Sequence, residues 1–151
     1  MNPKKNFSSR QNIPYYSQCD IFIDDVNYLL IYPMEKEEII ADWLDAWNCH
    51  DIDRIMAHYA EEIEFTAQTV VARWGKADGK LVGKAELREH FAKGLELAPE
   101  IHFEMDQILW SPNGYAVLYH RENNNQVLDT VELNAEGLAV KVTAYYLKVQ
   151  A

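Results

Sequence analysis

Apolar side chains recur every three or four residues in two consecutive segments of the chain. The apolar positions are Ile40, Trp43, Leu44 and Trp47 in the first segment and Ile52, Ile55, Met56 and Tyr59 in the second. This spacing places one apolar stripe along a helix, so two amphipathic helices are predicted. Asp51 stands between them, where its side chain can accept hydrogen bonds from the first free backbone N–H groups of the second helix. The pattern therefore predicts a tight helical corner.

The segment that follows the second helix has a different composition. Residues 62–72 are rich in β-branched and aromatic side chains and predict a strand. One face of this strand would carry Ile63, Phe65 and Ala67. Residues 73–83 contain three glycines and predict a loop.

A third helix and a run of strands complete the pattern. Residues 84–97 predict the helix, because apolar side chains recur there at a spacing of four. The apolar period then changes to two, and four strands are predicted at residues 101–110, 115–122, 126–134 and 138–149. Three helices followed by an antiparallel meander predict an α+β domain, in which a cone-shaped curved sheet wraps over the helices and leaves an internal pocket.

Composition and charge narrow the possible partners. A chain of 151 residues that is 48% hydrophobic can form one packed domain. Its net charge of −10 repels phosphate backbones and anionic lipid, so neither nucleic acid nor membrane is expected as a partner. The sequence contains no glycine-rich phosphate loop, and no cofactor is predicted.

The chain is expected to divide into an N-terminal extension, residues 1–33, and one domain, residues 34–151. No apolar run is long enough for a membrane span, and no clean signal peptide is present, which favours a cytoplasmic protein. The two cysteines, Cys19 and Cys49, are too few for a disulfide framework and lack the spacing of metal ligands.

Three segments in order resemble the nuclear transport factor 2-like superfamily, and in particular its SnoaL-like branch. They are residues 46–65, 78–91 and 131–146, and the resemblance extends over about residues 35–148. It implies the cone-shaped fold described above. It also implies a homodimer, to which the residues that face outward on the last strand could contribute. These residues are Lys141, Thr143 and Tyr145.

Asp129 is the first candidate for chemistry, because it lies between two valines on one face of a predicted strand, where a charge is costly unless it is paired. If residues 123–125 form a three-residue hairpin loop, Tyr119 is opposite Asp129 and Arg121 is opposite Val127. Arg121 would then lie diagonally close to Asp129 and could form an ion pair with it. Two interpretations are open: the three polar side chains satisfy one another inside the barrel, or they line a ligand site.

Comparison with two enzyme families of the superfamily that the chain resembles argues against steroid isomerisation and epoxide hydrolysis. Asp129 matches the strand aspartate of ketosteroid isomerases, but Trp43 stands at their tyrosine position and Ala67 at their base position, so steroid isomerisation is not expected. Arg121 and Asp129 are faintly similar to the arginine and aspartate of limonene epoxide hydrolases. The second aspartate of that site is missing, since Asp106 is predicted on the face opposite the apolar one.

The presumed pocket is otherwise lined by aromatic and small apolar side chains. The predicted lining residues are Trp43, Trp47, Tyr59, Phe65, Val117, Val142, Ala144 and Tyr146. Such a cavity can hold a small apolar molecule, on which Asp129, with Tyr119 and Arg121, would act as the acid/base of a lyase, isomerase or cyclase. The alternative is a non-catalytic dimeric binding or interaction module, whose pocket is filled by its own aromatic side chains.

The five histidines show no metal-ligand spacing, and no bound metal is predicted. His50 is expected to bond locally at the corner. His58 and His90 are expected to be solvated on outer helix faces, and His102 and His120 to lie on the polar faces of their strands.

Overall fold

The computed structural model describes residues 36–148. The boundary predicted between residues 33 and 34, and Cys19, lie outside the described residues. In chain order the elements are α1 (Lys36–Asn48), α2 (Ile52–Met56), β1 (Tyr59–Ala67), α3 (Gln68–Trp74), β2 (Lys80–Val82), α4 (Lys84–Leu97), β3 (Phe103–Ser111), β4 (Gly114–Arg121), β5 (Gln126–Leu133) and β6 (Ala139–Tyr146). No helix within this part of the chain is long and apolar enough to cross a membrane.

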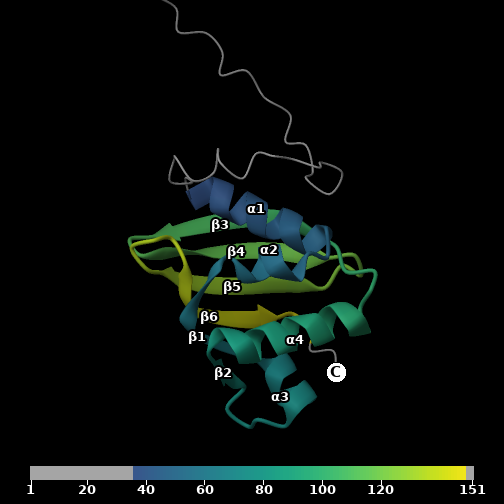
Figure 1. Cartoon of the computed structure of the whole chain (residues 1–151). Coiled ribbons are helices and arrows are strands. Elements are labelled where there is room, and N and C mark those ends of the chain that lie inside the picture. The colour runs from purple at the N-terminus through teal and green to yellow at the C-terminus, as the bar shows by residue number, and fades with distance from the viewer. Residues whose placement is uncertain (1–35, 149–151) are drawn as a thin grey trace, which may run out of the picture.

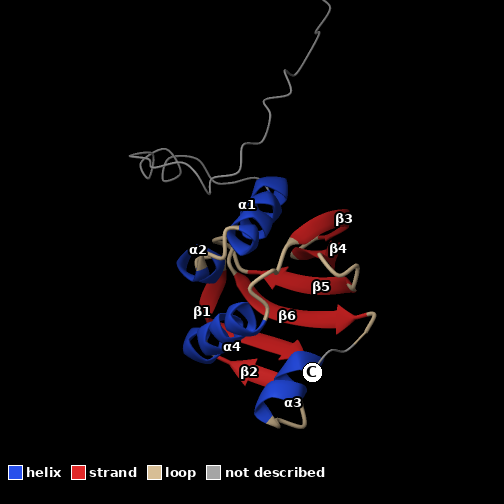
Figure 2. Cartoon of the chain, turned by 90° about the vertical axis from the view of Figure 1, so that its right-hand side faces the viewer, coloured by secondary structure: helices blue, strands red, loops and turns tan. Residues whose placement is uncertain are grey.

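The strands of the described chain form a single curled sheet in the order β2-β1-β6-β5-β4-β3. The pair β1 and β6 is parallel and the other pairs are antiparallel. Helices α1, α2 and α4 lie against one face of the sheet, and α3 lies at its β1–β2 end (Figures 1 and 2). The predicted α+β class, with a curved sheet wrapped over helices from the N-terminal half, is confirmed.

The helical corner forms as the apolar pattern predicts, but its second helix is short. Asp51 accepts a hydrogen bond from the backbone N–H of Arg54 at 3.2 Å and caps α2. Helix α2 ends at Met56. Tyr59, predicted as its last apolar position, instead begins β1 and pairs with Ala139 of β6. The apolar stripe therefore continues into the sheet, so that both elements contact one core.

The strand predicted at residues 62–72 ends early, at Ala67. The residues that follow form α3, although valine has a low helix propensity, because the side chain of Val70 is fully buried there. Gly75 ends this helix in a left-handed conformation, and its N–H donates to the carbonyl of Val71 at 3.0 Å. The predicted loop at residues 73–83 also contains β2, which pairs with β1.

The register of the β4–β5 hairpin differs by two residues from the predicted one. Tyr119 is opposite Val127, and Val117 is opposite Asp129. The cause is Asn125, predicted as part of the loop but buried in the structure. Its side-chain amide exchanges two hydrogen bonds with the backbone just after β6, which holds it in the sheet. The turn therefore falls one residue earlier.

Candidate functional site

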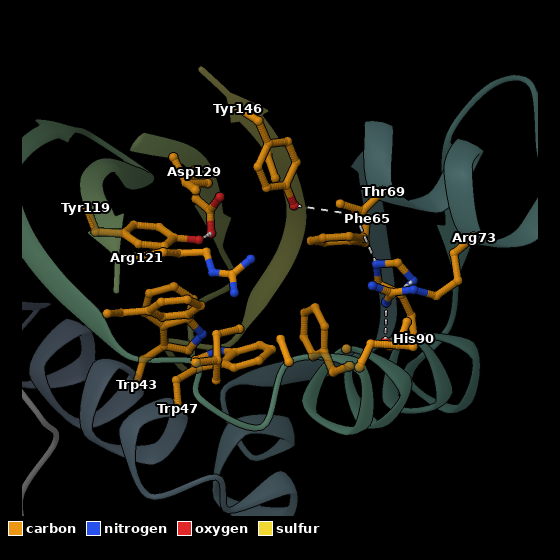
Figure 3. A pocket seen from close by; sticks show the side chains of 18 of the residues that line it. Trp43, Trp47, Phe65, Thr69, Arg73, His90, Tyr119, Arg121, Asp129 and Tyr146 are labelled. Carbon is orange, nitrogen blue, oxygen red and sulfur yellow. Dashed lines mark hydrogen bonds between the residues drawn. The ribbon is translucent and has the colours of Figure 1, made fainter. Parts of the chain in front are cut away.

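A cavity of about 250 Å³ opens between the helices and the concave face of the sheet (Figure 3). This volume is much more than one water molecule occupies and is close to the lower end of small-molecule pockets. Aromatic rings form most of its wall: Trp43, Trp47, Tyr59, Phe65, Phe91 and Phe103. The rings hold one another in place by edge contacts, as in the pair Trp47 and Phe91, whose centroids lie 5.0 Å apart at 73°.

Six of the eight predicted lining residues lie in this wall: Trp43, Trp47, Tyr59, Phe65, Ala144 and Tyr146. Val117 and Val142 do not. They are buried beside a crevice of about 10 Å³ that also touches Asp129. The register accounts for the position of Val117, because it places Val117 directly opposite Asp129, where Tyr119 had been predicted. The two valines therefore fill the core next to the pocket.

Asp129 extends from β5 into the pocket and is only 5% exposed. Its Oδ2 accepts a hydrogen bond from the Tyr119 hydroxyl at 3.4 Å, a diagonal contact across the hairpin. Its Oδ1 is buried and has no hydrogen-bond partner within residues 36–148. Burial raises the pKa of Asp129 to about 7, although the Tyr119 hydrogen bond opposes the rise. Both protonation states are therefore populated near neutral pH, and the carboxyl group can exchange a proton.

Arg121 also lines the pocket, but the predicted ion pair with Asp129 does not form. Its Nη2 donates instead to Glu122 Oε1 at 2.6 Å. Glu122 is held in turn by the backbone N–H of His102, which donates to its Oε2 at 3.0 Å. The Glu122 carboxylate is next to Arg121 in the chain and is already oriented by His102, so Arg121 pairs with Glu122. The guanidinium still points into the pocket (Figure 3), with a buried Nε that has no partner among the described side chains and backbone.

His90 forms part of the opposite wall, and its prediction as a solvated residue is wrong. It is 3% exposed and lies against Phe65 and Phe91. Burial, together with the charge of Arg73, lowers the pKa of His90 to about 4, so the ring is neutral at pH 7. The sequence contained a signal for this: Leu87, His90 and Phe91 are three and four residues apart on one face of α4.

A chain of hydrogen bonds connects His90 to the pocket. Trp74 Nε1 donates to His90 Nδ1 at 2.9 Å, so in the neutral ring Nε2 carries the proton. This nitrogen is 3.2 Å from the hydroxyl of Thr69, which is 3.4 Å from the hydroxyl of Tyr146 (Figure 3). The sequence reasoning missed Thr69, because it lies in the segment predicted as a strand. This series of hydrogen bonds orients the Tyr146 hydroxyl at the pocket wall.

Two further histidines differ from their predictions. His50 has a left-handed backbone (φ 55°), and its Nε2 lies 2.8 Å from the carbonyl oxygen of Ile101. It therefore connects the corner to a segment distant in sequence. His58 Nε2 pairs with Asp42 Oδ2 at 2.8 Å, and its side chain is largely buried. Within the described chain, no group of three His, Cys, Asp or Glu side chains is arranged to hold a metal ion.

Asp106 does not supply a second carboxylate to the pocket. It lies at an irregularity in the β3–β4 pairing, and its Oδ1 is 2.9 Å from Nδ1 of His120. Besides Asp129, the carboxylate on the described pocket lining is that of Glu100, which is exposed.

Residues 40–146 match the model of the SnoaL-like domain family. The chain is similar to a SnoaL-like protein of unknown function from Burkholderia thailandensis, with 28% identity and a TM-score of 0.72 over 78% of this chain and 100% of that chain. A nuclear transport factor 2-like protein of unknown function from Cytophaga hutchinsonii shares the fold, with 11% identity and a TM-score of 0.60 over 77% of this chain and 93% of that chain.

TerC, co-crystallized with polyporic acid, also shares the fold, with 13% identity and a TM-score of 0.61 over 74% of this chain and 90% of that chain. No curated protein matches the sequence at a significant level. The family match spans both the helical corner and the meander that together form the pocket. This protein therefore belongs to the SnoaL-like domain family and has its nuclear transport factor 2-like fold.

Proposed function

We propose that the protein binds a small, largely apolar organic molecule in the cone of its sheet and acts on it by acid–base chemistry, as a lyase, isomerase or cyclase. The observation that carries this proposal is the buried carboxyl group of Asp129, which lies on the lining of an aromatic-walled cavity and has one oxygen without a hydrogen-bond partner among the described residues. An organic ligand is also in keeping with TerC, a protein of the same fold that was co-crystallized with polyporic acid.

The proposed step is proton transfer at a carbon next to a ligand carbonyl. The carboxylate of Asp129 takes the proton, and the electron pair of the broken C–H bond forms an enolate, whose oxygen carries the negative charge. Arg121, on the pocket lining, supplies positive charge to that oxygen. Asp129 then returns the proton to the same or another carbon. Its pKa near 7 suits both directions of transfer.

The alternative function, a binding module whose own aromatic side chains fill its pocket, is less well supported. A self-filled pocket would leave room for few water molecules, whereas this cavity measures about 250 Å³. The aromatic rings stand around the cavity rather than across it.

Filling the cavity should abolish binding. The Ala144→Phe variant places a ring on the pocket floor, and we expect its affinity for β-tetralone, a bicyclic ketone, to fall about tenfold or more. The matched control is Thr143→Phe, whose side chain is on the opposite face of the same strand. Isothermal titration calorimetry measures both affinities. Equal binding by the two variants, or no binding of β-tetralone by the unmodified protein, would contradict the proposed pocket function.

We also propose that the outer face of the sheet forms a homodimer. Leu109 of β3 and Tyr145 of β6 are 57% and 56% exposed on this face, beside the predicted outward residues Lys141 and Thr143. Exposed apolar side chains of this size favour an interface.

Charges at the outer face should therefore separate the subunits. The double variant Leu109→Glu and Tyr145→Glu is expected to halve the mass measured by light scattering at micromolar concentration, because it buries two carboxylates in an apolar contact. Val82→Glu, on the exposed edge strand β2, is the control. A monomeric unmodified protein, or a double variant that stays dimeric, would rule out this interface.

A further inference from the structure

Two guanidinium groups line the pocket, and one of them has no carboxylate partner among the described residues. Arg73 of α3 donates through Nη1 to the backbone carbonyl of His90 at 2.7 Å. It forms no ion pair with any residue between 36 and 148. Its side chain is partly withdrawn from water, and this burial lowers the pKa of Arg73. A partly buried cation without a counter-ion is costly, and a bound anion would compensate this cost.

Arg121 presents a second cation from the other side. Its side chain is only 17% exposed, and Glu122 holds one nitrogen from a position outside the pocket lining. The buried Nε has no hydrogen-bond partner among the described residues. In Figure 3, Arg121 reaches into the pocket beside Asp129, and Arg73 lies beside His90. Two cations therefore face the same cavity from different walls.

The hydroxyl of Tyr146 lies within the field of both arginines. Burial and the charge of Asp129 raise the pKa of Tyr146 to about 12, while Arg73 and Arg121 both act to lower it. A hydroxyl at this point can donate a hydrogen bond to an anion that lies between the two guanidinium groups.

The remaining charged groups of the pocket leave room for an anion. His90 is neutral at pH 7, because burial lowers its pKa to about 4. Burial raises the pKa of Asp129 to about 7, so a bound anion does not meet a permanent negative charge there. Glu100 is exposed to solvent, which screens its charge.

From these contacts we infer that the ligand is an organic carboxylate, held between Arg121 and Arg73 and against the Tyr146 hydroxyl, with its apolar body on the aromatic wall. A guanidinium group fits a carboxylate with paired hydrogen bonds, whereas a neutral ligand would leave Arg73 without a counter-ion among the described residues. The inference rests on the proposed function, since it names the class of molecule that the same pocket takes.

The test compares two probes of the same shape, β-naphthoate and its neutral amide β-naphthamide. Titration at pH 7, followed by tryptophan fluorescence, should show that the protein binds β-naphthoate about tenfold or more tightly than the amide. Arg73→Met and Arg121→Met should each remove most of this preference, and amide binding should stay within about threefold. Retained amide binding shows that each variant is folded. Arg121→Lys, which keeps the charge but loses the paired donors, should be intermediate.

Arg88→Met is the matched control. Arg88 is an exposed arginine of α4 that pairs with Asp53 at 2.7 Å and does not line the pocket, so its loss changes the net charge equally. The preference for β-naphthoate should be unchanged in this variant.

Three results would overturn the inference. The unmodified protein could bind acid and amide equally, both pocket variants could keep the preference, or Arg88→Met could lose it as they do. Each of these leaves the proposed function intact as long as β-tetralone binds. If neither naphthalene probe nor β-tetralone binds, the proposed function itself fails, and the inference fails with it.

Discussion

The Asp129→Asn variant is expected to remove a proton from a bound ketone at a rate about 100-fold or more below that of the unmodified protein. This factor is the usual contribution of a positioned acid or base. Asparagine keeps the shape of the side chain and can still accept a hydrogen bond from Tyr119. It cannot take up a proton as the Asp129 carboxylate can, because a side-chain amide is not basic near neutral pH. Binding of the ketone should therefore persist while exchange stops.

Exchange can be measured without knowledge of the natural substrate. Proton NMR in heavy water follows the replacement of hydrogen by deuterium at the carbons next to the carbonyl of β-tetralone. The unmodified protein should accelerate this replacement above the buffer rate, and Asp129→Asn should not. Asp106→Asn is the control, because Asp106 bonds His120 outside the pocket. An Asp129→Asn protein that exchanges at the unmodified rate would remove Asp129 from the mechanism.

The same substitution should change how stability depends on pH. The folded-state pKa of Asp129 is about 7, against 3.8 in the unfolded chain, so the folded protein holds a proton that the unfolded chain releases between these values. The contribution of Asp129 to the free energy of unfolding is fully present below about pH 4 and is lost as the pH rises to 7. At about 1.4 kcal/mol per pH unit, the loss is about 4 kcal/mol. Asp129→Asn should lack this decrease and be the more stable protein above pH 7.

The groups that face Asp129 do not titrate in this interval. Burial raises the pKa of each facing phenol above its ordinary value; these are Tyr59, Tyr115, Tyr119 and Tyr146. The effect of Asp129 can therefore be measured as the difference in free energy of unfolding between Asp129→Asn and the unmodified protein.

Urea denaturation at pH 4.5, 6 and 8 measures that difference as free energy of unfolding. The gap between Asp129→Asn and the unmodified protein should widen with pH, whereas Asp106→Asn should follow the unmodified protein. Parallel curves for all three proteins would show that burial does not keep Asp129 protonated in the fold.

Much of the fold follows from short-range patterns. The apolar stripe of α1, the Asp51 cap and the alternation along β3 to β6 involve residues within a few positions of one another, so the elements form where their periods predict. The segment after Ala67 is the exception. Its valines favour a strand locally, but burial of Val70 against the sheet stabilises a helix. No local pattern contains that contact.

The site was less predictable than the fold. The sequence indicates Asp129 because a charged residue lies between two valines. Its predicted contact with Tyr119 is present although the register differs, because diagonal side chains in a hairpin are also within reach. The partner of Arg121 could not be predicted in the same way. A shift in the position of the turn decides which carboxylate the guanidinium meets, and that position depends on the side-chain bonds of Asn125.

The sequence by itself determined the order of α1, α2, β1, α4 and the strands β3 to β6, the curled sheet and one buried carboxyl group, since these depend on periodicity and on the cost of burying charge. Only the tertiary structure decided which polar groups share the pocket with that carboxyl. His90 and Arg73 come from helices that precede β5 in the chain. His90 packs against Phe65 of the sheet, and Arg73 donates to the carbonyl of His90. Contacts between such distant segments arise from the curvature of the sheet, which no local sequence pattern records.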